Sequence, residues 1–166
     1  MDFPSAYQAL KTGNCDVAAL NPPTSYSAEA EGFMISSSLG NLDVPQYDSI
    51  IASSKTFNDK SDLLKKYIKA FYEATDALQA DSEMAAQLLY DWYVENGSEA
   101  TLEACKSEIE TRPFVTSEEA RNIKLGESVQ ITAEFWVEQG LLEESKFPEV
   151  EKHVNDTLVK EVLSGQ

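Results

Sequence analysis

The stretch Ser61–Leu78 constrains the fold of this chain more than any other part of the sequence. Its mostly apolar positions recur at intervals of three and four residues, which places them along one face of a helix. These positions are Leu63, Leu64, Tyr67, Ile68, Phe71, Thr75 and Leu78. Lysine and glutamate side chains occupy the other side, and Ser61-Asp62 can cap the first turn. The pattern predicts a long amphipathic helix whose stripe belongs to a core.

Further helices are predicted downstream. One begins at Asp81 or Ser82 and ends at Asn96-Gly97, where glycine suits a left-handed stop. The side chains expected on its buried side are Met84, Ala85, Leu88, Leu89 and Trp92. The next helix is expected to begin at Ser98 and to end at Arg112. Its apolar side chains are Leu102, Cys105 and Ile109.

The last third of the chain is also expected to be helical. Thr116 or Ser117 caps a short helix to Ile123, and a longer one spans Gly126 to Gln139 before a left-handed Gly140. The inward residues of the longer helix are expected to be Val129, Thr132, Ala133, Trp136 and Val137. A final apolar pattern breaks near Asn155-Asp156.

The N-terminal third has a different pattern. A helix from Ser5 to Leu10 closes at Gly13 or Asn14, and a short apolar run follows it. Runs of this kind between turn residues predict strands, here at Cys15–Leu20, Phe33–Leu39 and Gln46–Ser53. The fold class predicted for the whole chain is therefore α/β, helix-rich, with a short sheet.

The corner after the first predicted strand is the candidate site. Asn21-Pro22-Pro23-Thr24-Ser25 turns the chain into a helix from Tyr26 to Glu31, which Gly32 ends. A strand that ends at such a corner leaves backbone N–H groups free at the carboxyl edge of a sheet, where small ligands bind in open α/β folds. The alternative is an ordinary connection between a strand and a helix.

Several motifs in order carry a resemblance to a known family. The opening pattern a-x-x-A-L-x-x-G-x-x-D-x-A-x-L-x-x-P, followed by A-E-A-x-G-F, resembles the type II periplasmic-binding fold. The stretches LLKKYIKAFYEATDAL and VQITAEFWVEQGLL extend the resemblance. Specifically, the chain is similar to ABC-transporter solute receptors for sulfonates, taurine, nitrate and thiamine pyrimidines. The resemblance runs from about Ser5 to Leu163 and matches only the later half of such a receptor.

The resemblance implies a solute-binding component of an ABC importer, with permease subunits as partners. A small polar or anionic organic solute is then expected in a cleft between two lobes, where Thr24 and Ser25 hydroxyls hold its head group and Tyr26 gives an apolar wall. The residues it points to are Asn21, Pro22, Thr24, Ser25, Tyr26 and Tyr47. Tyr47 is equally well explained by packing at the start of a strand. Asn21 replaces what is often an aromatic or acidic residue, so the solute class cannot be carried over.

The expected organisation is one domain over residues 1–166, a fragment of a two-lobed receptor. Residues 1–45 would be part of the second lobe, 46–60 a return strand and hinge, and 61–166 a helical C-terminal part. The full-length receptor is expected outside the cytoplasm. No signal segment precedes the first helix, which fits either a truncated receptor or a cytosolic protein. Truncation would also expose sheet edges, so self-association is expected.

The composition argues against nucleic-acid binding, membrane-surface binding and catalysis. The net charge of −16, with 29 acidic residues, opposes binding to nucleic acid or to anionic membrane surfaces. The single histidine, His153, is expected at the surface and leaves no catalytic triad or His-rich metal site. Cys15 and Cys105 are expected to be buried thiols. No enzyme activity, metal or cofactor is therefore expected.

Arg112 has two interpretations. It could bind a substrate carboxylate or sulfonate, or it could pair with one of the acidic side chains of the chain itself. Two other classes of function also remain open. One is a helix-rich protein-interaction module with a large exposed apolar patch. The other is the cytosolic effector-sensing domain of a transcription regulator, against which the long helical tail argues.

Overall fold

The computed structural model describes residues 2–38 and 49–165, apart from the side chains of residues 150 and 151. The chain divides into two compact units. Unit 1 consists of Met1–Ser36 and Thr75–Val115, and unit 2 consists of Ser37–Ala74 and Thr116–Gln166. Helix α4 (Ser61–Ala80) contributes its residues up to Ala74 to unit 2 and its remaining residues to unit 1. The expected division at residues 45 and 60 stays a prediction.

The predicted α/β fold class is wrong for the described residues, which form helices, turns and irregular segments but no β-strand. Residues 15–20, 33–38 and 49–53 have no regular structure, and the Val17 side chain is 78% exposed. The remainder of the second and third predicted strands lies outside the described residues. An apolar run between turns is not sufficient for a strand, because a strand also requires backbone hydrogen bonds to a neighbouring strand, and the described residues contain none.

Unit 1 contains α1 (Phe3–Lys11), α2 (Thr24–Ala30), α5 (Ser82–Glu95) and α6 (Leu102–Thr111), together with the end of α4. The Asp81 side chain accepts a hydrogen bond from the Met84 N–H at 3.0 Å, so the predicted cap of α5 is confirmed. Helix α6 begins later than predicted because Thr101, rather than Ser98, accepts from the Ala104 N–H.

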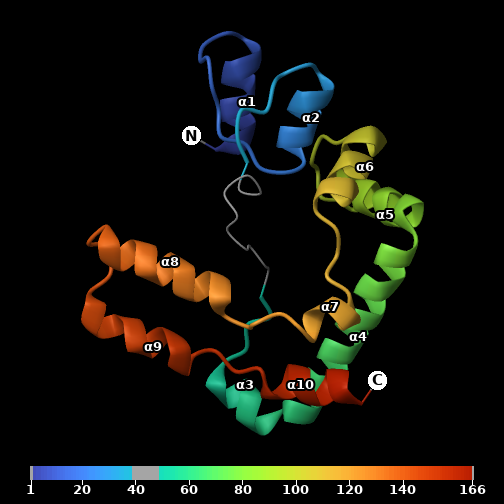
Figure 1. Ribbon diagram of the computed structural model, residues 1–166. Helices are drawn as coiled ribbons and strands as arrows, with labels where there is room; N and C mark the ends of the chain where they lie inside the picture. The colour runs from blue at the N-terminus through green and yellow to red at the C-terminus, as the bar shows by residue number, and fades with distance from the viewer. Residues whose placement is uncertain (1, 39–48, 166) are drawn as a thin grey trace. The chain divides into compact units, whose positions relative to one another are not determined.

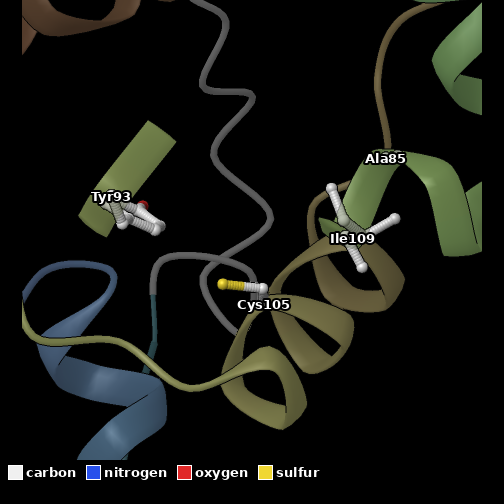
Figure 2. Close-up of a cluster of buried hydrophobic side chains, with 5 residues drawn as sticks. Ala85, Tyr93, Cys105 and Ile109 are labelled. Atoms are coloured by element: carbon white, nitrogen blue, oxygen red, sulfur yellow. The ribbon is translucent and has the colours of Figure 1, made fainter. Parts of the chain in front are cut away.

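The core of unit 1 lies between α5 and α6. It consists of Ala85, Ala86, Tyr93, Cys105 and Ile109. Figure 2 shows this cluster, with Ile109 next to Ala85. The two alanines and Cys105 are at most 1% exposed, so the helices approach closely through small side chains.

Polar and aromatic contacts join α1 to the end of α2 and to the segment that follows it. The Lys11 ammonium lies 2.8 Å from the Glu31 carboxylate at the end of α2. The same ammonium lies 5.1 Å from the ring centre of Tyr7, whose ring meets Phe33 edge-on. Burial raises the pKa of Tyr7 to about 12, with the Glu31 charge acting in the same direction. Gly13 and Gly32 have positive φ angles, as their predicted roles as helix stops require.

Unit 2 contains most of α4 and a series of short elements. These are α3 (Ser54–Asp59), α7 (Ser117–Ala120), α8 (Glu127–Glu138), η2 (Glu144–Lys146), α9 (Phe147–Lys152) and α10 (Thr157–Ser164). Helices α8 and α9 lie side by side (Figure 1). Thr116 and Glu119 form a capping box at α7, although this helix ends at Ala120 rather than Ile123. The break predicted near Asn155 separates α9 from α10.

Tertiary contacts hold the two ends of unit 2 together. The Lys65 ammonium of α4 lies 2.5 Å from the Glu161 carboxylate of α10, and Arg121 Nε donates to the Leu163 carbonyl at 3.2 Å. Gly126 has a φ of +82°, and a Cβ atom there would lie 2.6 Å from the Val154 side chain. This position therefore needs glycine both for its conformation and for the close approach of Val154.

The helices were predicted more accurately than their buried faces. On α4, Ile68 and Thr75 are buried as expected. Other residues predicted to be inward are exposed, namely Leu63, Tyr67 and Phe71 of α4, Met84, Leu88 and Trp92 of α5, and Val129, Thr132 and Trp136 of α8. Large apolar side chains on several helices therefore remain in contact with solvent.

Candidate functional site

The predicted corner lies at the start of α2 and is not sealed by packing. Asn21 is exposed, whereas Pro22, Thr24, Ser25 and Tyr26 are half-buried. The Ser25 N–H donates to the Asn21 carbonyl at 3.0 Å, so the turn itself uses one of the backbone donors expected to bind a ligand. Because no strand precedes the corner, the sheet-edge argument for this site no longer applies. Tyr47, the sixth candidate, lies outside the described residues.

A groove lies within unit 1, between α2 and α6. Its volume is about 310 Å³, near the lower end of the range of about 300–1,000 Å³ typical of small-molecule sites. The lining residues are Tyr26, Glu29 and Ala30 of α2, and Glu103, Ala104, Ser107, Glu110 and Thr111 of α6. Of the predicted site residues that the structure describes, Tyr26 alone lines this groove. We refer to it below as the α2–α6 groove.

Hydrogen bonds fix the position of Tyr26 at one side of the α2–α6 groove. The Thr111 hydroxyl donates to the Ser107 carbonyl at 2.8 Å, so it accepts the hydrogen bond that joins it to the Tyr26 hydroxyl. Tyr26 therefore donates its proton to α6 and keeps its oxygen lone pairs as acceptors. The contact anchors α2 against α6 and presents the ring of Tyr26 at the groove.

The electrostatic character of the groove differs from the prediction. Three of the lining side chains are carboxylates, those of Glu29, Glu103 and Glu110, and none is a lysine or arginine. Carboxylates repel an anionic head group and can accept hydrogen bonds from a polar or cationic one. The lining therefore favours a neutral polar or cationic solute over an anion.

Sequence reasoning missed the α6 side of the groove. Glu103, Ser107, Glu110 and Thr111 are spaced by four, three and one residues, which places them on one face of a helix. The spacing was visible in the sequence, but polar residues at helical intervals are typical of any solvated face. Only the position of α2 distinguishes this face from the rest of the acidic surface.

Arg112 does not line the α2–α6 groove. One of its guanidinium nitrogens donates to Glu108 Oε1 at 2.9 Å, so the pairing with an acidic side chain of the chain itself is confirmed. The Tyr93 hydroxyl donates to Glu108 Oε2 at 3.0 Å. Burial raises the pKa of Glu108 above its ordinary value, while the hydrogen bonds and positive charge of its partners act in the opposite direction.

The two cysteines and the histidine differ in how far they are exposed. Both cysteines are free; Cys105 is buried as expected, whereas Cys15 is only half-buried. Burial raises the pKa of the Cys105 thiol, which keeps it in the unreactive protonated form. His153 is exposed, as predicted. Across residues 2–38 and 49–165, no group of three or more His, Cys, Asp or Glu side chains could hold a metal ion.

Comparison with known proteins supports the family resemblance. The chain is 58% identical over 164 residues to a Brachyspira hyodysenteriae protein named "Putative ABC transporter periplasmic binding protein". The chain therefore resembles a binding protein along nearly its whole length. The alignment covers 99% of this chain but 47% of the relative, so the chain spans about half the length of the curated relative that it matches. No family model and no solved structure matches.

In the part of the chain that the structure describes, no helix is both long and apolar enough to cross a bilayer. The printed name of the Brachyspira protein describes a binding protein and gives no solute. The specific sulfonate, taurine and nitrate group is not supported beyond the sequence motifs.

Proposed function

We propose that this chain forms one half of the solute-binding component of an ABC importer. The observation that carries the proposal is 58% identity over 99% of the chain to a protein named as a periplasmic binding protein. Identity at this level over 164 residues implies the same fold as the matched half of the relative. The proposed role is binding without catalysis, in an extracytoplasmic protein that delivers solute to permease subunits.

The α2–α6 groove is the proposed contribution of this chain to the solute site. Tyr26 supplies a flat wall whose orientation is set by Thr111, and Ser107 and Thr111 add hydroxyl groups. The carboxylates of Glu29, Glu103 and Glu110 suit ammonium or hydroxyl groups of a small polar solute. Asn21, Pro22, Thr24 and Ser25 remain candidate contacts at the neighbouring corner.

The finer assignment to a type II fold of the sulfonate, taurine, nitrate and thiamine-pyrimidine group rests on the sequence motifs. In a receptor of that group, the half that lies outside this chain supplies the opposite wall of the cleft. Solute then stabilises the closed form in proportion to its preference for that form. In the proposed receptor, the α2–α6 groove is one wall of a cleft whose opposite wall lies outside this chain.

A chimeric protein tests the proposed function. We would first screen the whole Brachyspira protein by thermal shift with taurine, aliphatic sulfonates, nitrate, pyrimidines and small amines. This chain would then replace the 164 matched residues of that protein. The chimera is expected to bind the same solute within about tenfold of the parent affinity, because the other wall is unchanged. Tyr26→Ala is expected to weaken binding, and Val17→Ala, outside the groove, serves as the matched control.

Two outcomes would contradict the proposal. One is a folded chimera that binds no solute while the parent does. The other is equal binding by the Tyr26→Ala and Val17→Ala chimeras, which would remove the α2–α6 groove from the site even if the receptor role survived. Circular dichroism of each chimera would establish that loss of binding does not reflect loss of folding.

A helix-rich protein-interaction module is the second candidate, and one observation favours it. Met84, Leu88 and Trp92 form an exposed apolar stripe on α5, of a kind that interfaces often contain. Under this alternative the chain would bind a protein and no solute. A negative solute screen together with a defined protein complex would favour it.

A further inference from the structure

One face of α5 carries three large apolar side chains that are exposed to solvent. Met84, Leu88 and Trp92 follow one another at intervals of four residues and are 40%, 52% and 57% exposed. Residues at this spacing lie on one face of a helix. We call these three residues the outer stripe.

The outer stripe continues the apolar surface that α5 uses for folding. Each of its members is followed directly by a residue of the inner side, namely Ala85, Leu89 and Tyr93, which pack toward α6. On the far side, Gln87 donates to Asp91 at 2.8 Å and forms a polar border. An apolar strip between a packed core and a polar rim has the anatomy of an interface.

The residue types also indicate a partner. Tryptophan is the residue most enriched among those that dominate binding energies, and methionine is also enriched at interfaces. These exposed apolar side chains lie on a chain with a net charge of −16. Exposed tryptophan, leucine and methionine at consecutive turns are poorly explained as a solvated face of such an acidic chain.

The relative suggests what covers this face. This chain corresponds to 47% of the Brachyspira protein, so more than half of that polypeptide lies outside the matched region. A segment of the same polypeptide is held near a helix face at high effective concentration, so it binds that face without a separate association of two molecules. We propose that the outer stripe packs against the part of the longer protein that lies outside the matched 164 residues. The inference shares with the proposed function only the premise that this chain is half of a longer protein.

Carbene footprinting of this chain and of the whole Brachyspira protein tests the inference. In this chain, the peptide that carries Leu88 and Trp92 is expected to be labelled strongly. In the whole relative, the aligned positions are expected to be labelled at least about threefold less, since an interface core excludes solvent. Cys105 and its aligned position, buried on the inner side of α6, should be protected in both proteins and serve as the folding control.

A substitution in two contexts gives a second test. Leu88→Glu is expected to leave the melting temperature of this chain unchanged, because the side chain is exposed. The equivalent substitution in the whole relative should lower its melting temperature by more than about 5 °C, because a charge is then buried. Gln87→Lys, on the polar border, adds a charge that can pair with Asp91 and is the matched control; it should change the melting temperature of either protein by less than about 2 °C.

Two results would overturn the inference. Equal labelling of the outer stripe in both proteins would mean that nothing in the longer chain covers it. Concentration-dependent dimers of this chain that Leu88→Glu abolishes, with no added protection in the whole relative, would assign the face to a second copy. Either result could be obtained while the chimera still binds solute, so failure here is distinguishable from failure of the proposed function.

Discussion

The inner and outer faces of α5 differ in a way that hydrophobicity alone does not predict. The inner face includes two small side chains, Ala85 and Ala86, which are 1% and 0% exposed and let α6 approach closely. The outer stripe carries larger apolar side chains, including Trp92, and is about half exposed. The comparison shows that an apolar pattern identifies residues suited to burial, whereas the available neighbours decide which of them are buried.

The largest expected effect is on the inner face. Ala86→Leu adds volume where the helices already touch, and overpacking of this kind costs roughly 1–3 kcal/mol of unfolding free energy. Urea denaturation followed by circular dichroism would measure the loss. Gln87→Leu, one position further along and exposed, is the control. An Ala86→Leu protein as stable as the control would mean that α5 and α6 do not pack closely.

The buried carboxylate opposite α5 is expected to have the next largest effect. Glu108→Ala leaves the Tyr93 hydroxyl without its acceptor and Arg112 without its ion-pair partner. An unsatisfied buried donor costs about 1–3 kcal/mol. Glu110→Ala, on the exposed groove side of the same helix, should change stability by less than about 0.5 kcal/mol. Equal effects of the two substitutions in urea denaturation would argue against the Tyr93–Glu108–Arg112 network.

The raised pKa of Glu108 predicts that the stability of the protein depends on pH. Burial raises the pKa of Glu108 in the folded state, so the folded protein holds this proton more tightly than the unfolded chain does. Its contribution to stability is fully present below the unfolded pKa of about 4.3 and is lost as pH rises through the folded pKa. The stability of the wild-type protein relative to Glu108→Gln should therefore fall over the pH range above about 4.3. Urea midpoints measured across this range would test the sign, and a rising difference would contradict it.

The smallest effect is expected on the outer stripe. Leu88→Ala in this chain should change the free energy of unfolding by less than about 0.5 kcal/mol, because an exposed side chain loses few contacts. Thermal melts of this variant and of Ala86→Leu, for which about 1–3 kcal/mol is expected, give the sharpest contrast between the two faces of α5. A large cost for Leu88→Ala would show that the outer stripe is already covered in this chain.

Local signals predicted the helices well. The caps at Asp81 and Thr116, the stop at Gly140 and the break near Asn155 all depend on a few adjacent residues, and each is present in the structure. The strand expected at Cys15–Leu20 is absent from the structure. A strand needs backbone hydrogen bonds to a second strand, which can lie anywhere in the sequence. The sequence pattern contained no information about whether such a partner was present.

The candidate site was predictable only in part. Tyr26 was singled out from the proline corner and does line the α2–α6 groove, although the predicted strand edge is absent. Thr111 and Ser107 were missed because their role depends on how α2 lies against α6, which no local pattern encodes. The function proposed for the chain now rests on its relative and its motifs rather than on the geometry first expected.

Calorimetric titration of this chain alone tests the central claim most directly. The titrant is the solute that the thermal-shift screen identifies for the whole Brachyspira protein. If this chain supplies only one wall of the binding cleft, it should bind at least about a hundredfold more weakly than the whole protein, or show no measurable heat. Micromolar binding by the 166 residues alone, equal to that of the whole protein, would contradict the account of this chain as half of a receptor.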